Sequence, residues 1–103
     1  MDKTAVIEIA KRYAQRIIQH MQPIEVILYG SYAKGTAKEE SDIDIAVVVS
    51  KVEGDFLDEA VLLFKLCHQI DDRIEPVLII ESHDESGFLE EIRKTGCCVY
   101  PIA

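Results

Sequence analysis

The sequence lacks most of the features that would place it outside the ordinary globular class. No apolar run approaches the ~18 residues that a membrane-spanning helix requires. Residues 1–15 contain neither a long apolar stretch nor a small-residue cleavage site, so we expect no signal peptide. Cys67, Cys97 and Cys98 are odd in number and form no Cys-x-x-Cys pair, which argues against a disulfide framework and a structural zinc site. We therefore expect a reducing, cytoplasmic location.

Basic residues are also scarce. Eleven lysines and arginines stand against 19 acidic residues, which gives a net charge of -8. Such a surface repels phosphate backbones, so we expect no stable nucleic-acid binding and no membrane association. Internal repeats, low-complexity tracts and linkers are missing too, and the 103 residues are long enough for one modest core. We predict a single domain over residues 1–103.

Apolar residues recur at helical spacing in three segments. The pattern predicts a helix over residues 3–21, a second over 56–71, and a short third one opened by Asp84 and Glu85 and ended by Gly96. On the first helix the expected apolar stripe is Val6, Ala10, Tyr13, Ile17 and Met21, with Ile7, Ala14 and Ile18 beside it. On the second it is Leu57, Ala60, Val61 and Phe64, flanked by Leu63, Leu66 and Ile70, and on the third it is Phe88, Leu89 and Ile92.

Apolar runs rich in β-branched residues predict strands over 24–29, 44–49 and 74–80, with a last short strand over 97–102. The resulting order is α-β-β-α-β-α-β. This order indicates an α/β (α+β) fold in which helices pack on one mixed sheet.

Two aspartates stand at the start of the second strand. Strand side chains alternate between faces, so Asp42 and Asp44 should share a face and place their carboxylates a few ångströms apart. Like charges this close destabilise each other unless something neutralises them. A hard divalent cation such as Mg²⁺ does so, because it takes one or two carboxylates and completes its shell with water and nucleotide phosphates.

A Gly-Ser pair directly follows the first strand. Gly30 would let a ligand approach the backbone, and Ser31 offers an amide and a hydroxyl to phosphate oxygens. A short helical turn after Ser31 would add further amides, and Lys34 adds a cation. Nearby Tyr32 is a candidate either for stacking on a base or for packing. If the first two strands are neighbours, the segment reads as a site for a nucleoside triphosphate and magnesium.

The segment GSYAKGTAKEESDIDIAVVV resembles the signature of the DNA polymerase β superfamily of nucleotidyltransferases, in which Gly-Ser precedes Asp-x-Asp by ten residues. Its residue pattern, GS-x-A-x-G…SDID, and the length of the chain resemble those of the minimal nucleotidyltransferases. The resemblance implies a mixed-sheet palm that binds two Mg²⁺ ions and ATP. It implies that Gly30 and Ser31 hold phosphates, and that Asp42 and Asp44 hold both metals.

The resemblance also implies a third carboxylate on a later strand, and Glu75 is the best match. Glutamate stands at position 75 where aspartate is commoner in the family, so its side chain reaches further. Lys34 stands where arginine is usual, and because lysine cannot bind a phosphate with two parallel hydrogen bonds, we expect it to hold the phosphate more weakly. A plain strand-edge charge is the alternative reading of Glu75, since Pro76 already indicates an edge strand. Asp71 and Asp72 are rivals, although a solvated turn accounts for them better.

The same resemblance implies a partner. Minimal nucleotidyltransferases are often antitoxins that transfer AMP to a tyrosine of a HEPN-domain toxin, which would make this chain a protein adenylyltransferase in a homo- or hetero-oligomer. Two alternatives stay open. The domain could neutralise a partner by docking alone, without catalysis. It could also modify a small molecule, with a second subunit completing the pocket.

Overall fold

The computed structural model describes residues 2–38, 40–84 and 86–101. Nine elements follow one another along these residues, and the order confirms the predicted arrangement of helices and strands. They are α1 (Lys3–Ile17), β1 (Glu25–Tyr29), α2 (Ser31–Lys34), β2 (Ile43–Val49), α3 (Phe56–Cys67), β3 (Ile74–Ile80), the 3-10 turn η1 (Glu81–His83), α4 (Phe88–Thr95) and β4 (Cys97–Tyr100).

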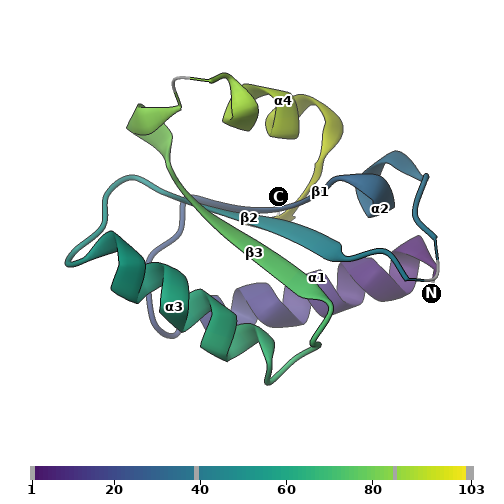
Figure 1. The fold of residues 1–103 in the computed structure, drawn as a ribbon, viewed down its shortest axis with the longest axis horizontal. Coiled ribbons are helices and arrows are strands. Elements are labelled where there is room, and N and C mark those ends of the chain that lie inside the picture. Colours follow the sequence, from purple (N-terminus) through teal and green to yellow (C-terminus); the bar gives the residue numbers. More distant parts are fainter. Residues whose placement is uncertain (1, 39, 85, 102–103) are drawn as a thin grey trace.

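The four strands form one mixed sheet in the order β3-β2-β1-β4. β1 runs antiparallel to both β2 and β4, whereas β2 and β3 are parallel. The mixed sheet is thus confirmed, and β3 lies at its edge, as the proline at position 76 indicates. Figure 1 shows α1 and α3 on one side of the sheet and α4 on the other.

Strand alternation distributes the core between these two faces. On β2, Ile45 and Val47 belong to the large cluster shared with α1 and α3, whereas Ala46 and Val48 contact Leu89 and Ile92 in a smaller cluster with α4. The site-bearing side chains follow the same alternation. Asp44 therefore projects from the α4 face of the sheet.

The first helix is shorter than its apolar stripe predicts. It begins at Lys3, where the Asp2 carboxylate accepts a hydrogen bond from the Ala5 amide at 2.8 Å. It ends at Ile17 instead of Met21, because the amides of Gln19 and His20 bond to carbonyls three residues back and tighten the chain into a turn.

Most residues of the apolar stripe predicted for the second helix are not buried. α3 ends at Cys67, four residues early, and its buried side chains are Leu63, Leu66 and Cys67. Leu57, Val61 and Phe64 are exposed instead. The helix carries apolar residues around most of its circumference, so periodicity alone could not identify the side that packs on the sheet.

The last helix begins later than predicted. Both carboxylate oxygens of Asp84 accept hydrogen bonds from α4, from the amides of Leu89 at 3.0 Å and Glu90 at 3.3 Å. Asp84 therefore opens the helix from outside it, while Glu85, its predicted companion, lies outside the described residues. Leu89 and Ile92 are buried as predicted, but Phe88 is 42% exposed.

The final strand pairs with β1 and extends only to Tyr100, and Ile102 of the predicted strand lies outside the described residues. Within the part of the chain that the structure describes, no helix is long and apolar enough to span a bilayer.

Candidate active site

The candidate site is centred on Asp44, the first acidic residue inside β2. Asp44 pairs with Tyr29 of β1 on one side and with Glu75 of β3 on the other. Partners in register on neighbouring strands project from the same face, so the carboxylates of Asp44 and Glu75 are neighbours. Asp42 lies two residues before Asp44, just outside β2. The fold thus brings together three carboxylates that the sequence separates by 33 residues.

Gly30 lies directly against this carboxylate cluster. Its φ of 74° and ψ of -149° define a conformation that essentially only glycine adopts. A Cβ atom at this position would come within 3.2 Å of the Asp44 Cγ and even closer to its Oδ2. The absence of a side chain therefore opens the space beside Asp44, where a phosphate could approach the backbone.

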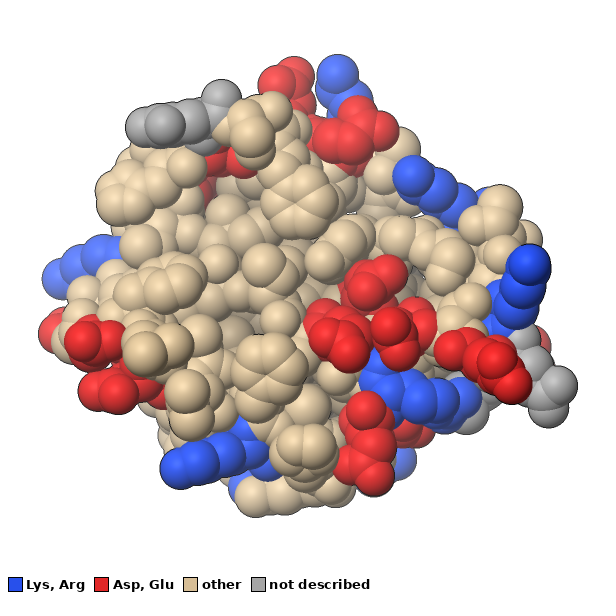
Figure 2. All heavy atoms as spheres, viewed as in Figure 1, with Lys and Arg blue, Asp and Glu red and all other residues tan. Residues whose placement is uncertain are grey.

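The electrostatics of the cluster follow from this crowding. Partial burial raises the pKa of the Asp44 carboxyl, and the neighbouring charges of Asp42 and Glu75 raise it further. Figure 2 shows acidic side chains gathered in one cluster beside an uncharged surface. The ionised form of Asp44 is thus destabilised in the protein alone, as expected at a site that attracts a cation.

Tyr29 belongs to the site, although the pattern Gly-Ser…Asp-x-Asp does not include it. Burial raises the pKa of its phenol, and the charges of Asp44 and Glu75 raise it further. Its ring meets the Phe88 ring edge-on, with centroids 5.6 Å apart. Its position was the only signal in the sequence, because Tyr29 closes β1 directly before Gly30. Tyr32, the alternative aromatic, is buried and packs in the core, so the stacking interpretation of Tyr32 is wrong.

Ser31 and Lys34 are the two ends of α2, a single turn of helix that follows Gly30. The first amides of any helix have no acceptor within it, so those after Gly30 are available to a phosphate. Ser31 is half-buried, whereas Lys34 is exposed and has no contact with the three carboxylates within the described residues. Ser31 therefore adjoins the site through its neighbour Gly30, whereas no ion pair among the described residues joins Lys34 to it.

The rival carboxylates lie in the turn before β3, close to the start of β2, where the Arg73 carbonyl accepts a hydrogen bond from the Ile43 amide at 2.8 Å. Asp71 accepts hydrogen bonds from the Arg73 guanidinium at 2.8 and 3.0 Å, and this pairing lowers the pKa of its carboxyl. Asp72 contacts His68 at 3.0 Å. Both residues lie in the turn between α3 and β3, as predicted. Asp72 is exposed, whereas the Asp71 side chain is partly buried against Arg73.

The carboxylates of the candidate site suit a magnesium ion that keeps water and phosphate ligands better than a metal ion bound by protein side chains alone. Among residues 2–38, 40–84 and 86–101, no three His, Cys, Asp or Glu side chains are arranged to enclose a metal ion by themselves. Magnesium does not require such a cage, because it commonly takes one or two carboxylates and completes its shell with water and substrate phosphate. The pair of crowded carboxylates beside an open glycine fits this second kind of site.

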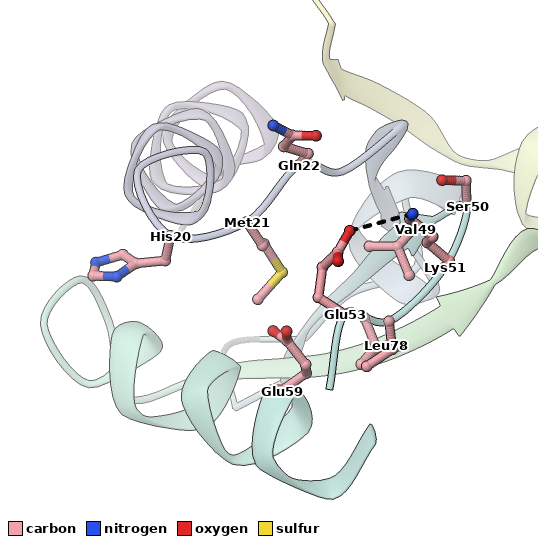
Figure 3. A pocket seen from close by; sticks show the side chains of 10 residues that line it. His20, Met21, Gln22, Val49, Ser50, Lys51, Glu53, Glu59 and Leu78 are labelled. Carbon is pink, nitrogen blue, oxygen red and sulfur yellow. Dashed lines mark ion pairs between the residues drawn. The ribbon is translucent and has the colours of Figure 1, made fainter. Parts of the chain in front are cut away.

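A pocket of about 360 Å³ lies elsewhere, at the opposite end of β2 (Figure 3). Val49 and Ser50 contribute to its wall, together with the ion pair between Lys51 and Glu53. Val49 is five residues from Asp44, or roughly 17 Å along an extended strand. None of the predicted site residues lines this pocket, so the pocket and the carboxylate cluster are separate sites on the protein.

Comparison with known proteins identifies the family of the chain. The family model "Polymerase beta, Nucleotidyltransferase" matches residues 11–102. The protein named "Putative protein adenylyltransferase MJ0141", from Methanocaldococcus jannaschii, is 30% identical over 97 residues, which cover 88% of this chain and 95% of that protein.

The fold has a solved counterpart as well. The crystal structure described as that of a putative nucleotidyltransferase from Sulfolobus solfataricus superposes with a TM-score of 0.65 at 18% identity, over 93% of this chain and 80% of that one. The fold and the family model thus agree. The chain belongs to the polymerase β-like nucleotidyltransferase family.

Proposed function

We propose that this chain is a magnesium-dependent protein adenylyltransferase that transfers AMP from ATP to a hydroxyl group of a partner protein. The observation that carries the proposal is the position of Gly30, which leaves open the space next to Asp44 while Asp42 and Glu75 crowd the same carboxylate. Phosphate-binding backbone and metal-binding carboxylates thus share one spot. The M. jannaschii relative, named as a protein adenylyltransferase, favours a protein acceptor.

Each site residue would bind phosphate, bind metal or accept a proton. The Gly30–Ser31 backbone would hold the β and γ phosphates, with Lys34 reaching them from the exposed end of α2. Asp42 and Asp44 would bind two Mg²⁺ ions, and Glu75 would bind one of them. Bound Mg²⁺ would neutralise the charge that develops on the phosphates. Glu75 would also receive the proton of the acceptor hydroxyl as that oxygen bonds to the α-phosphorus and pyrophosphate leaves.

The nature of the partner follows from the family resemblance and from charge. We propose a HEPN-domain toxin as the acceptor, with this chain as its cytoplasmic antitoxin. A net charge of -8 argues against a nucleic-acid acceptor. Glu75 is exposed on the edge strand β3, and Asp42 is exposed beside it, which leaves these carboxylates accessible to a macromolecular acceptor.

The test uses ATP labelled at the α-phosphorus, Mg²⁺ and the co-purified partner. Label should move to the partner, and mass spectrometry should find one added AMP. Single removal of Asp42, Asp44 or Glu75 should cost nearly as much activity as removing all three, because the carboxylates act as one unit. Ser31→Ala should be milder, since the backbone amides remain.

The competing function is a non-catalytic nucleotide-binding module that neutralises its partner by docking. It would be supported if Asp42→Ala/Asp44→Ala still neutralised the partner fully in cells and no label moved in the purified reaction. Full neutralisation without transfer would therefore overturn the enzymatic proposal.

A further inference from the structure

The outer side of α3 is apolar and uncovered. Leu57 is 68% exposed, and Val61 and Phe64 are each more than 40% exposed. With about 100° of rotation per residue, these three side chains lie within roughly 60° of one another. They form a continuous strip along the helix, which we call the α3 stripe. Isolated exposed apolar residues need no explanation, but an aligned set on one helix indicates a contact surface.

The α3 stripe faces away from the rest of the protein. The side of α3 toward α1 is marked by the buried Leu63, whose carbonyl accepts a hydrogen bond from the Tyr13 hydroxyl of α1 at 2.7 Å. All three stripe residues lie more than a quarter of a turn from Leu63 around the helix. Figure 2 shows an uncharged surface extending across this part of the molecule.

Two opposite charges flank the α3 stripe. Asp58 and Lys65 are exposed on its outer margin, and within the described residues neither has an ion-pair partner. They are seven residues apart, and so are Leu57 and Phe64. Each pair therefore spans two helical turns, or about 10 Å.

The equal spacing of the apolar pair and the charged pair indicates that the α3 stripe binds a second copy of the same helix. When two α3 helices pack antiparallel with Val61 at the two-fold axis, Leu57 of each copy lies within one residue of the level of Phe64 of the other, and Asp58 within one residue of the level of Lys65. In a parallel pair the two charged margins would lie on opposite sides of the interface, and Asp58 could not reach Lys65 of the other copy. We propose that the α3 stripe is a self-association surface, and that the chain forms a two-fold dimer through antiparallel α3 helices.

The dimer goes beyond the proposed function, because the two surfaces are on opposite faces of the sheet. α3 packs on the face that carries Ile45 and Val47, whereas the carboxylate of Asp44 is on the α4 face. Two active sites would thus remain open in the dimer, and a failure of either proposal would leave the other standing.

The experiment measures the molar mass of the full chain by sedimentation equilibrium over a wide range of concentrations. Wild type should be a dimer in reversible equilibrium with monomer. Val61→Glu should raise the dimer Kd by at least about thirtyfold, because it places two carboxylates at the centre of the interface. Phe88→Ser is the matched control: Phe88 is similarly exposed, at 42%, but lies on α4, so the Kd should not change.

Charge reversal tests the antiparallel register. Asp58→Lys and Lys65→Asp should each weaken the dimer by roughly two- to tenfold, and the double swap should restore it, since two rim pairs are exchanged in each dimer. Circular dichroism melting confirms that each variant is folded. A monomeric wild type at every concentration, an effect of Phe88→Ser equal to that of Val61→Glu, or a double swap weaker than both single variants would overturn the proposal.

Discussion

Replacing Gly30 by alanine tests the geometry of the site at its tightest point. The backbone conformation at Gly30 costs a residue with a Cβ on the order of 1–3 kcal/mol. The new methyl would also press on the Asp44 carboxylate, at 3.2 Å from its Cγ. We therefore expect the melting temperature of Gly30→Ala to fall by roughly 4 to 24 °C, given about 4–8 °C per kcal/mol for a domain of this size.

The same substitution should remove the stabilisation that a nucleotide provides. At a hundredfold excess over its Kd, ATP with Mg²⁺ should stabilise wild type by ~2.7 kcal/mol, and this gain should vanish in Gly30→Ala because the methyl fills the space beside Asp44. Thermal denaturation with and without the ligand measures both effects.

Gly35 provides the matched control. It also has a positive φ, of 77°, but a Cβ there would meet no atom within 4 Å. Gly35→Ala should lose roughly 1–2 kcal/mol from backbone strain alone and keep the whole nucleotide-dependent gain. If Gly30→Ala retained that gain to the same extent as Gly35→Ala, the assignment of Gly30 to the phosphate site would be refuted.

Three further predictions concern the fold and its charge. Tyr13→Phe should destabilise the protein by about 1 kcal/mol in urea unfolding, because the buried hydroxyl donates to the Leu63 carbonyl at 2.7 Å; an unchanged midpoint would contradict this. Pairing with Arg73 lowers the pKa of the Asp71 carboxyl, so the pair stabilises the fold above the ordinary aspartate pKa and this stabilisation is lost as pH falls through the lowered pKa. Asp71→Asn should therefore reduce the loss of unfolding free energy at acid pH. An unchanged loss at acid pH would exclude this contribution. Random single-stranded oligonucleotides should show no binding at physiological salt, and sub-micromolar, salt-sensitive binding would contradict the charge argument.

The strands and the carboxylate pair could be predicted from the sequence because they depend on local alternation. β3 begins and ends where its β-branched run does, and Asp44 faces the side that period-two alternation assigns to it. The approach of Gly30 to Asp44 depends in addition on β1 pairing with β2, which the sequence allows but does not require.

The errors occur where tertiary packing decides between equivalent local choices. α3 offers two apolar sides, and only its position over the sheet determines that Leu63 and Leu66 are buried while Phe64 is not. The role of Tyr29 was overlooked for a similar reason. Its neighbours Glu75 and Phe88 come from distant segments, and no spacing along the chain reveals that contact.

The central claim is that Asp42, Asp44 and the Gly30 backbone form one site for Mg²⁺ and a nucleotide. Calorimetric titration of ATP into the protein, with Mg²⁺ and then with a chelator, tests it most directly. Wild type should bind one ATP per chain only with Mg²⁺. Asp44→Asn should bind none while melting no lower than wild type, since it relieves repulsion from Asp42 and Glu75. Equal affinity with and without Mg²⁺, or undiminished binding by a folded Asp44→Asn, would contradict the claim.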